Sequence, residues 1–307
     1  MNYDMIGDIH GCSRTLESLL SKLGYHKEDG VYRHPERTAI FLGDFIDRGP
    51  YQREVILIVR SMMEAGAAQS VMGNHEYNAI AYATPDRKNG GHLRAHSQKN
   101  MIQHEAFLDE YVFDSADHRE VIDWFKSLPM WLDLGGIRVI HACWDQVFIE
   151  QIGSSLITDE LLYASCDKDL WQYDAIETIL KGKEMPLPSG HHFNDKFGNP
   201  RHDIRVRWWD ESADTFKKAF LGPESALTQI PGDEIHGDHL IEYSHEAPPV
   251  FLGHYWLEGE PEPLAANIAC IDYSVAKAGG KLAAYRWDGE AVLSKEKYVT
   301  AERVEPQ

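Results

Sequence analysis

Three short polar segments of this chain carry residue types that bind metal ions. They are Gly7-Asp8-Ile9-His10-Gly11, Gly43-Asp44-Phe45-Ile46-Asp47-Arg48-Gly49-Pro50 and Gly73-Asn74-His75-Glu76. Carboxylate and amide oxygens, together with imidazole nitrogens, are ligands of divalent cations at sites without thiolates. If the fold brings the three segments together, they predict a metal centre with further charged groups beside it.

Each segment follows a short apolar run that predicts a buried strand, and a helix follows the first two. The strands are predicted at residues 3–7, 39–42 and 69–72. Ser13 is expected to cap a helix that stops at Gly24, and a second helix is expected from Gln52 to Ala65. Repeated strand–loop–helix units predict a largely parallel sheet with right-handed crossovers, whose strand ends are the usual place for chemistry in α/β enzymes.

Two later apolar strands end in histidines. The run 137–140 follows the run 130–134 across Gly135-Gly136, which predicts a hairpin that delivers His141. The run 248–252 ends in Gly253-His254. A single histidine of this kind is more often a hydrogen-bonded core residue than a ligand. Because five strands end in Gly, Asp, Asn or His groups, the joint pattern favours a site.

A centre with two metal ions needs a bridging carboxylate surrounded by oxygen and imidazole ligands, with the ions about 3.5–4 Å apart. The strand ends supply such a set: Asp8, His10, Asp44, Asn74, His141 and His254. Because the set contains no thiolate, it suits Mn²⁺, Fe or Zn²⁺ at an open site better than a closed structural zinc site.

In order and spacing, these motifs resemble those of the calcineurin-like metallophosphoesterases. Asp47-Arg48-Gly49 is similar to the motif of the serine/threonine phosphoprotein phosphatase branch, which includes bacterial phosphatases and diadenosine tetraphosphate hydrolases. The resemblance runs from about residue 7 to residue 254 and covers the core. It implies an α/β fold, namely a four-layer αββα sandwich with two mixed sheets.

The resemblance also implies a role for each matching residue. Asp8 and His10 would hold one metal ion, Asn74, His141 and His254 the other, and Asp44 would bridge the two. His75 would protonate the leaving oxygen, with Asp47 orienting it, and Arg48 would clamp phosphate oxygens. Two divalent ions, with Mn²⁺ preferred and Fe or Zn²⁺ as alternatives, would hold a bridging hydroxide that attacks phosphorus directly, without a phosphoenzyme.

Several positions depart from the family pattern. Trp256 stands where many members have a second histidine, Tyr255 replaces a common threonine, and Ala142 replaces a glycine of the eukaryotic protein phosphatases. The branch uses a second arginine on the phosphate, for which Arg205 and Arg207 are both candidates.

The tryptophan pair Trp208-Trp209 lies beside these arginines. It is interpreted either as a wall that holds a phosphate or a ring, or as core aromatics with arginines that extend to water. The sequence leaves both interpretations open.

The whole chain, 1–307, is predicted to form a single metallophosphoesterase domain with insertions at about 82–117 and 183–245. The first insertion is polar, is expected to be partly helical and contains His92, His96 and His104. Other elements are expected as helices at 121–128 and 159–180 and as strands at 267–271, 281–287 and 291–293. A polar, frayed tail is expected from Glu302.

The composition restricts the partners. With 30 basic and 49 acidic residues, the net charge of −19 opposes nonspecific binding to nucleic acids or anionic membranes. The four cysteines have no paired spacing, no apolar run reaches the length of a membrane span, and the N-terminus has no signal-peptide pattern. The protein is therefore expected in the cytoplasm with reduced thiols, and the family resemblance implies a phosphorylated substrate. The sequence does not indicate whether the protein is a monomer or an oligomer.

Three functions were weighed. The main prediction is a phosphatase for phosphate monoesters, either phosphoproteins or small phosphorylated molecules. The alternative is a dinucleoside polyphosphate hydrolase of the diadenosine tetraphosphate type, in which the Trp208-Trp209 region would stack a base. A metal-binding scaffold without catalysis is not favoured, because neither a ligand nor the general acid is missing from the motifs.

Overall fold

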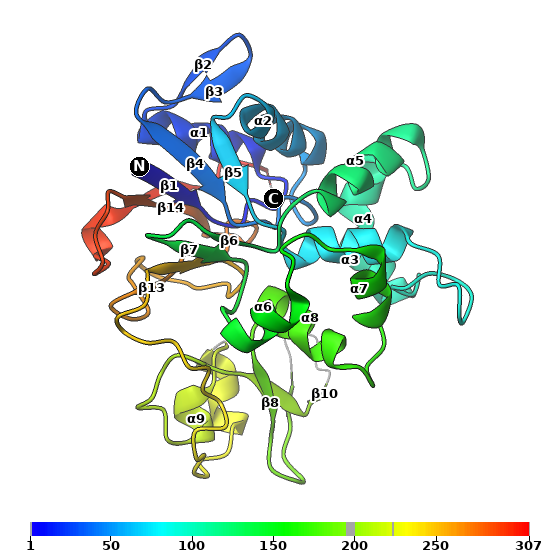
Figure 1. Cartoon of the computed structure of the whole chain (residues 1–307), viewed down its shortest axis with the longest axis vertical. Coiled ribbons are helices and arrows are strands. Elements are labelled where there is room, and N and C mark those ends of the chain that lie inside the picture. Colours follow the sequence, from blue (N-terminus) through cyan, green and yellow to red (C-terminus); the bar gives the residue numbers. More distant parts are fainter. Residues whose placement is uncertain (1, 195–199, 223, 307) are drawn as a thin grey trace.

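A computed structural model describes residues 2–194, 200–222 and 224–306 of the chain (Figure 1). Two large sheets form its centre. The five-stranded sheet has the order β15-β14-β1-β4-β5 and the four-stranded sheet the order β13-β12-β7-β6. The strands of the first sheet are β1 (Asn2–Ile6), β4 (Arg37–Phe41), β5 (Ala68–Ser70), β14 (Lys281–Trp287) and β15 (Tyr298–Glu302). Those of the second are β6 (Trp131–Asp133), β7 (Arg138–Ile140), β12 (Val250–Leu252) and β13 (Ile268–Cys270).

Both sheets are mixed, as the resemblance implies. In the first, β1, β4 and β5 are parallel, whereas β14 and β15 run antiparallel to their neighbours. In the second, β12 is parallel to β7 and β13, and β6 forms the predicted hairpin with β7. Ile40 and Leu42 belong to the core between the sheets, whereas Ala39 and Phe41 belong to the core under the helices. This alternation is expected of a strand buried on both faces.

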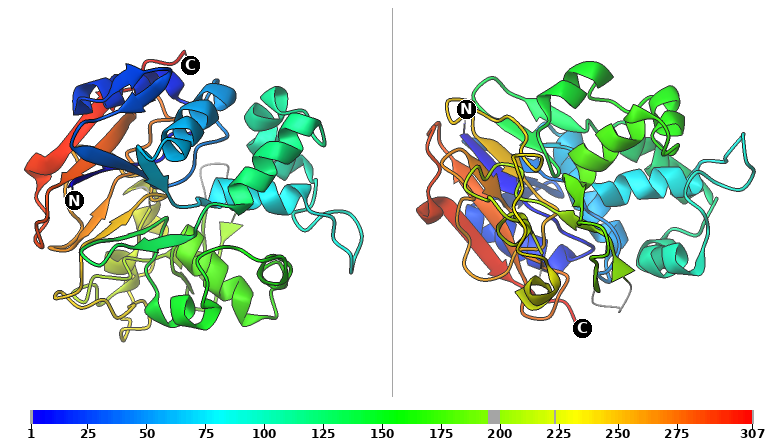
Figure 2. Two further views of the ribbon diagram at one scale, coloured as in Figure 1. Left: turned by 45° about the horizontal axis from the view of Figure 1, so that its top comes forward. Right: turned by 90° about the horizontal axis from the view of Figure 1, so that it is seen from below.

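Helices cover the outer faces of both sheets (Figures 1 and 2). On the first sheet, α1 (Ser13–Leu23) and α2 (Gln52–Glu64) bury apolar residues such as Leu19 and Val59 in the same core as Phe41. On the second, α8 (Trp171–Lys181) buries Ile176 and Ile179 with Leu252. The order helix, sheet, sheet, helix is the predicted four-layer αββα sandwich.

The two predicted early helices form nearly at their expected bounds. Gly24 ends α1 in the left-handed conformation, with φ of 90°, as expected of a helix-stopping glycine. The expectation that Ser13 caps α1 was wrong. Cys12 occupies the capping position, and Ser13 is a buried residue of the first turn.

Other expected elements need correction. The helical pattern at 159–180 forms two helices, α7 (Asp159–Ala164) and α8, and it is preceded by an unpredicted helix α6 (Gln146–Ile152). The turn-rich piece after α1 contains an unpredicted hairpin of β2 (His26–Glu28) and β3 (Val31–Arg33). No strand forms at 291–293 within the described chain, and β15 is the last strand instead.

The tail after β15 is anchored, which contradicts the expected fraying. The Glu305 side chain is 6% exposed and accepts hydrogen bonds from the backbone N–H and the hydroxyl of Thr15 at the start of α1. From the sequence alone, a glutamate at this position is expected to be exposed to solvent. Glu305 is buried instead, because its partners are buried hydrogen-bond donors in the first turn of α1.

The first predicted insertion is partly helical, as expected. The helix α3 (Asn74–Ala83) ends inside it, α4 (Gln98–Glu110) fills its second half, and α5 (Ala116–Lys126) begins at its end.

The second predicted insertion includes residues 195–199 and 223, which lie outside the described residues. Its elements are β8 (Glu184–Pro186), β9 (Phe193–Asn194), β10 (Pro200–Arg201), β11 (Asp203–Arg205), α9 (Phe216–Ala219) and the 3₁₀ helix η1 (Glu224–Gln229). These elements have an apolar cluster of their own, which includes Ile204, Val206 and Phe216. In Figure 1 they lie below the sandwich. That the chain is a single domain remains a prediction.

Across the described chain, the structure contains no helix that is both long and apolar enough to cross a membrane.

Candidate active site

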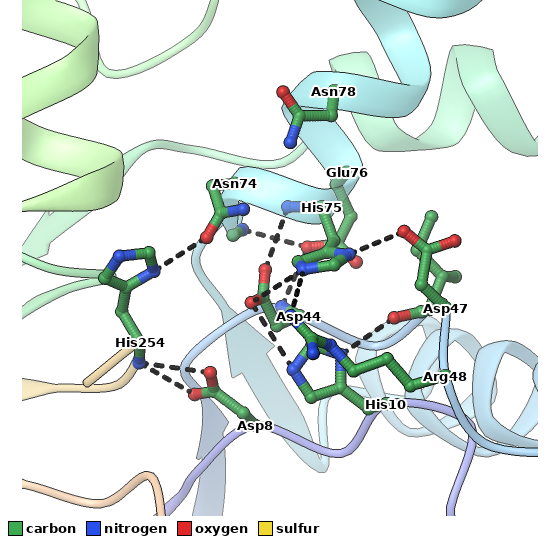
Figure 3. Close-up of polar contacts among 12 residues, drawn as sticks. Asp8, His10, Asp44, Asp47, Arg48, Asn74, His75, Glu76, Asn78 and His254 are labelled. Carbon is green, nitrogen blue, oxygen red and sulfur yellow. Dashed lines mark hydrogen bonds and ion pairs between the residues drawn. The ribbon is translucent and has the colours of Figure 1, made fainter. Parts of the chain in front are cut away.

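The six predicted metal ligands come together where strands of both sheets end. The loop after β1 carries Asp8 and His10, and the loop after β4 carries Asp44 (Figure 3). Asn74 begins α3 after β5, and His141 and His254 follow β7 and β12. The C-terminal ends of parallel strands meet at one edge of a sheet, so segments distant in sequence meet here.

Asp44 lies at the centre of this group. Its carboxylate is 1% exposed, and its Oδ1 lies 3.4 Å from Nε2 of His141. Its Oδ2 lies 3.7 Å from Nε2 of His10. The backbone N–H of His75 donates to Oδ1 at 2.9 Å. This carboxylate is therefore placed between two groups of nitrogen donors, as a bridging ligand must be.

Backbone acceptors orient the two histidines beside Asp44. Nδ1 of His10 donates to the Ile46 carbonyl at 2.9 Å, and Nδ1 of His141 donates to the Leu42 carbonyl at 2.6 Å. Each bond places the ring proton on Nδ1 and turns the lone pair of Nε2 toward Asp44. Within the described residues, Nε2 of His10 is buried without a hydrogen-bond partner. A buried acceptor of this kind fits a metal ligand.

The second group of donors gathers around Asn74. Its Oδ1 accepts from Nδ1 of His254 at 2.7 Å and lies 3.3 Å from Nε2 of His141. Asp8 accepts from the His254 backbone N–H at 3.2 and 3.0 Å. Nε2 of His254 is another buried nitrogen without a partner among the described residues.

Two sets of donor atoms, each within 4.8 Å of one another, share Asp44. They are His10, Asp44 and His75, and Asp44, His141 and His254. Imidazole and carboxylate donors, a shared carboxylate and buried partnerless nitrogens fit two divalent cations.

Close backbone packing holds the loops in this arrangement. Gly43 has φ of +87°, and a Cβ on it would lie 2.3 Å from the backbone nitrogen of Gly73. A side chain at Gly253 would lie 2.2 Å from Oδ1 of Asp8. Glycine is therefore required at both positions for the strand ends to approach.

Glu76 ties these loops together, a role that the sequence did not reveal. Its fully buried carboxylate accepts from the backbone N–H groups of Asp44, Phe45 and Gly73 at 2.8, 2.8 and 2.9 Å. Burial, together with the charge of Asp44, raises the pKa of Glu76 to about 7. The only sequence signal was its place in the Gly-Asn-His-Glu motif.

The electrostatics of the metal-free centre favour cation binding. Burial raises the pKa of Asp8 well above its usual value, and repulsion from Asp272 and Asp44 adds to this. Burial, with the nearby Arg48 charge, lowers the pKa of His10 to about 3. Despite burial, the pKa of His141 is instead raised, by the charge and hydrogen bond of Asp44. Crowded carboxylates and a neutral His10 therefore share one buried space, and divalent cations would supply positive charge there.

The predicted His75–Asp47 pair adjoins the metal ligands, and His75 itself belongs to one of the two donor sets. Nδ1 of His75 is 2.5 Å from Oδ2 of Asp47, and Nε2 of His75 accepts from Nη2 of Arg48 at 3.3 Å. The guanidinium of Arg48 lies over the ring of Trp256, 3.9 Å from its centroid, although the residue as a whole is exposed. The other oxygen of Asp47 contacts His104 of α4, at 2.8 Å from Nδ1. In the sequence, His104 was only one of three histidines in a polar insertion.

The two candidate arginines differ in place. Arg205 lies over the Tyr255 ring at 5.7 Å from its centroid, and its charge is among the causes, after burial, that lower the pKa of His254 well below its usual value. Arg207 is exposed and lines a surface hollow of about 490 Å³ with Asp210 and Lys217. Of the two arginines, only Arg205 is therefore near the metal ligands, next to His254.

The tryptophan pair does not form an open wall. Trp208 is fully buried, and its Nε1–H donates to the Tyr255 hydroxyl at 3.1 Å. Trp208 therefore presents no open face to a substrate base, and the prediction that this tryptophan region stacks a base is left to Trp209. Trp209 is half-buried, and its ring packs edge-on against the ring of Trp208.

The chain is similar in sequence to known proteins. The relatives include two proteins named bis(5'-nucleosyl)-tetraphosphatase PrpE (asymmetrical). That of Bacillus velezensis is 49% identical over 150 residues, 46% of this chain and 56% of the relative. That of Oceanobacillus iheyensis is 32% identical over 143 residues, 46% of this chain and 55% of the relative. The chain thus spans about half the length of these curated relatives.

A solved structure shares the fold. It is a protein serine/threonine phosphatase from Saccharomyces cerevisiae, with a TM-score of 0.52 and 16% sequence identity, covering 100% of this chain and 81% of that one. The family model described as calcineurin-like phosphoesterase matches residues 1–262, which is most of the chain. The protein belongs to the calcineurin-like phosphoesterase family.

Proposed function

We propose that this protein is a metal-dependent phosphoesterase that hydrolyses dinucleoside polyphosphates of the diadenosine tetraphosphate type. The observation that carries the reaction type is the juxtaposition of two donor sets sharing Asp44 with the His75–Asp47 pair and Arg48. The substrate class is supported by the names of the relatives. This proposal places the second sequence-based hypothesis ahead of the first, because those relatives are nucleotide hydrolases.

The metal ligands are assigned from the two donor sets, which supply His10, Asp44, His141 and His254, and from the family motifs, which add Asp8 and Asn74. Asp8 and His10 would hold one divalent ion, Asn74, His141 and His254 the other, and Asp44 both. When bound, the two cations lower the pKa of water toward neutrality and neutralise phosphate charge. The donor set suits Mn²⁺, and Fe or Zn²⁺ remain alternatives.

His75 supplies the proton for the leaving oxygen. Asp47 accepts from Nδ1 of the ring, and Nε2 lies 3.9 Å from Oδ2 of Asp44, on the side of the assigned metal ligands. A carboxylate in this position fixes the orientation of the ring and stabilises its protonated form. The proton on Nε2 is then transferred to the oxygen that leaves phosphorus, which prevents the release of an unprotonated leaving group.

Arginines hold the phosphate during this transfer. Arg48 lies between the face of Trp256 and Nε2 of His75. Its planar fork binds two phosphate oxygens, and Arg205 is the better placed of the two candidates for a second contact. Positioning and charge neutralisation account for most of the barrier reduction in phosphoryl transfer, so we assign direct hydrolysis without a phosphoenzyme.

Hydrolysis of phosphate monoesters, on phosphoproteins or small molecules, is the second candidate. The exposed Arg48 favours it, because a terminal phosphate can reach this guanidinium without a pocket for a base. The buried Trp208 removes one expected base-binding surface and is consistent with this candidate too.

A substrate comparison on purified, metal-depleted protein tests the proposal. Diadenosine tetraphosphate, a phosphopeptide and an aryl phosphate are each assayed with added Mn²⁺ and with a chelator. We expect activity that depends on Mn²⁺ and a kcat/KM highest for the dinucleotide. Preference for the phosphopeptide or the aryl phosphate would favour the second candidate, and Mn²⁺-independent turnover would reject the assigned mechanism. An Asp44→Asn variant is the control for contaminating phosphatases.

A further inference from the structure

His104 of α4 shares the carboxylate of Asp47 with His75. Its Nδ1 lies 2.8 Å from Oδ1 of Asp47, and Nδ1 of His75 lies 2.5 Å from Oδ2. An ionised carboxylate only accepts hydrogen bonds, so both imidazoles donate. The two oxygens of Asp47 are therefore each held by a histidine.

The His104 ring is fixed by its surroundings. The residue is 4% exposed, and its ring stacks on Phe107 at 4.8 Å and packs against Tyr82 at 5.3 Å between centroids. In the described part of the chain, its Nε2 is buried and has no hydrogen-bond partner. Among the described residues, the one hydrogen-bond partner of the His104 ring is therefore the Asp47 carboxylate at Nδ1. His104 thus gives Asp47 a hydrogen bond from a ring that aromatic packing holds in place.

The helix α4 is anchored without His104. Glu110, in its last turn, accepts from the backbone N–H groups of Gln52 and Arg53 at 2.7 and 2.9 Å, at the start of α2. The Gln52 side chain in turn accepts from the backbone N–H of Asp47 at 2.7 Å. Asp47 is therefore held at its backbone through Gln52 and at its carboxylate through His104, and loss of the His104 ring leaves the helix anchored.

We propose that His104 is a positioning residue for the proton transfer by His75. It fixes the rotation of the Asp47 carboxylate, so that Oδ2 stays on Nδ1 of His75 and Nε2 of His75 stays directed at the leaving oxygen. This inference rests on the proposed function. It gives the first insertion a part in the chemistry, because α4 belongs to it.

The test compares two substitutions at His104. His104→Phe keeps the ring volume and removes the donor, whereas His104→Asn retains an amide donor near the position of Nδ1. His118→Phe is the matched control, because His118 is 2% exposed and packs on the same Phe107 at 5.9 Å, away from Asp47. Each variant is assayed with Mn²⁺ on phenyl phosphate, whose leaving group needs a proton, and on dinitrophenyl phosphate, whose leaving group does not.

We expect His104→Phe to lower kcat on phenyl phosphate by about 10- to 100-fold, as loss of an orienting partner commonly does, with KM nearly unchanged. The loss on dinitrophenyl phosphate should be much smaller, and His104→Asn should recover most of the activity. Equal losses on both substrates, an Asn variant as impaired as the Phe variant, or a comparable loss in the His118→Phe control would overturn the proposal.

A second measurement is independent of turnover. In metal-free protein with isotope-labelled histidine, the downfield N–H resonance of His75 should be present in the wild type and in His104→Asn, and be lost or broadened in His104→Phe. An unchanged resonance in His104→Phe would contradict the positioning role. If the wild type hydrolyses neither phosphate ester nor dinucleotide, the proposed function fails, and this resonance still decides the role of His104.

Discussion

The imidazole of His75 contacts a carboxylate at one nitrogen and a guanidinium at the other. Asp47 lies 2.5 Å from Nδ1, and Arg48 donates to Nε2 at 3.3 Å. A phosphate that takes the hydrogen bonds of Arg48 removes the donor from Nε2. Nε2 can then carry the proton that the leaving oxygen needs, so phosphate binding and proton transfer share one arginine.

The substitution His75→Asn tests the assigned general acid. It should lower kcat by about 10²- to 10⁴-fold, the usual contribution of a positioned acid, because an amide cannot give up a proton. Mn²⁺ affinity, measured by calorimetry, should change little, since His75 is not among the six assigned ligands. Undiminished hydrolysis with metal bound would remove His75 from the mechanism.

Trp256, the residue that departs from the family histidine, supports Arg48. The guanidinium lies 3.9 Å from the ring centroid, a cation–π contact worth about 0.5–2 kcal/mol. Trp256→Ala should therefore raise KM about two- to thirty-fold, with a smaller effect on kcat. Trp256→Phe keeps an aromatic face and should recover part of the affinity. Steady-state kinetics of the two variants test whether Trp256 holds Arg48 for phosphate binding. An unchanged KM in Trp256→Ala would exclude this role.

Arg205 and Arg207 form a natural matched pair for the second phosphate contact. Arg205→Ala should raise KM about tenfold or more, because a hydrogen bond to a charged group contributes about 1.5–3 kcal/mol. Arg207→Ala should leave KM within about twofold, since its side chain lines a separate hollow. Competition by inorganic phosphate gives a second measure of both variants. The opposite ranking would reassign the contact to Arg207.

At the scale of elements, the end of the chain is joined to the start of α1. Glu305 accepts from the Thr15 backbone N–H at 2.8 Å and from its hydroxyl. Glu305→Ala leaves these buried donors without a partner and should lower the free energy of unfolding by about 1–3 kcal/mol. Glu302→Ala, at an exposed position of β15, is the control and should have little effect. Urea denaturation measures both, and equal effects would show that the Glu305 contacts contribute little.

The elements that the sequence predicted well are those that local patterns determine. Asp44 and Asn74 follow apolar strands and glycines, so their place at a strand end was readable from adjacent residues alone. His104, by contrast, reaches Asp47 from a helix 57 residues further along the chain. The spacing of apolar residues along the sequence does not reveal such a contact, because the contact depends on how α4 packs on α2.

The failures have the same physical origin. Ser13 has the residue type of a helix cap, yet the loop geometry places Cys12 at that position. Trp208 lies beside arginines in the sequence, yet packing against Tyr255 buries it. In both cases residue type gave a plausible local role, and tertiary packing determined the actual one.

At the scale of the molecule, acidic residues dominate the charge, with a net value of −19, and the site itself adds buried carboxylates. Asp8, Asp44 and Asp272 lie close enough for their charges to repel one another. The fold confines them because apolar strands on two sheets end at the same place. The metal-free protein therefore carries an electrostatic cost that the bound cations relieve.

Because of this electrostatic cost, we expect the stabilisation of the protein by bound metal to depend on pH. The pKa of Asp8 is raised by burial and by Asp272 and Asp44, so in the metal-free protein Asp8 keeps its proton above its ordinary range. As the pH rises through that raised pKa, the proton is lost, the metal-free protein is destabilised by a buried charge, and cation binding no longer has to displace a proton. Mn²⁺ affinity should therefore rise with pH, by up to about tenfold per pH unit while one proton is displaced.

The increase in melting temperature on adding Mn²⁺ should accordingly be larger at neutral than at mildly acidic pH, because ligand stabilisation grows with affinity. Asp8→Asn removes both the ligand charge and the titrating group, so this variant should show a smaller Mn²⁺ effect that varies less with pH. Parallel melting curves with Mn²⁺ and with chelator, for both proteins across this pH range, measure the difference. A wild-type increase that is constant or larger in acid would mean that the proton on Asp8 does not control metal binding.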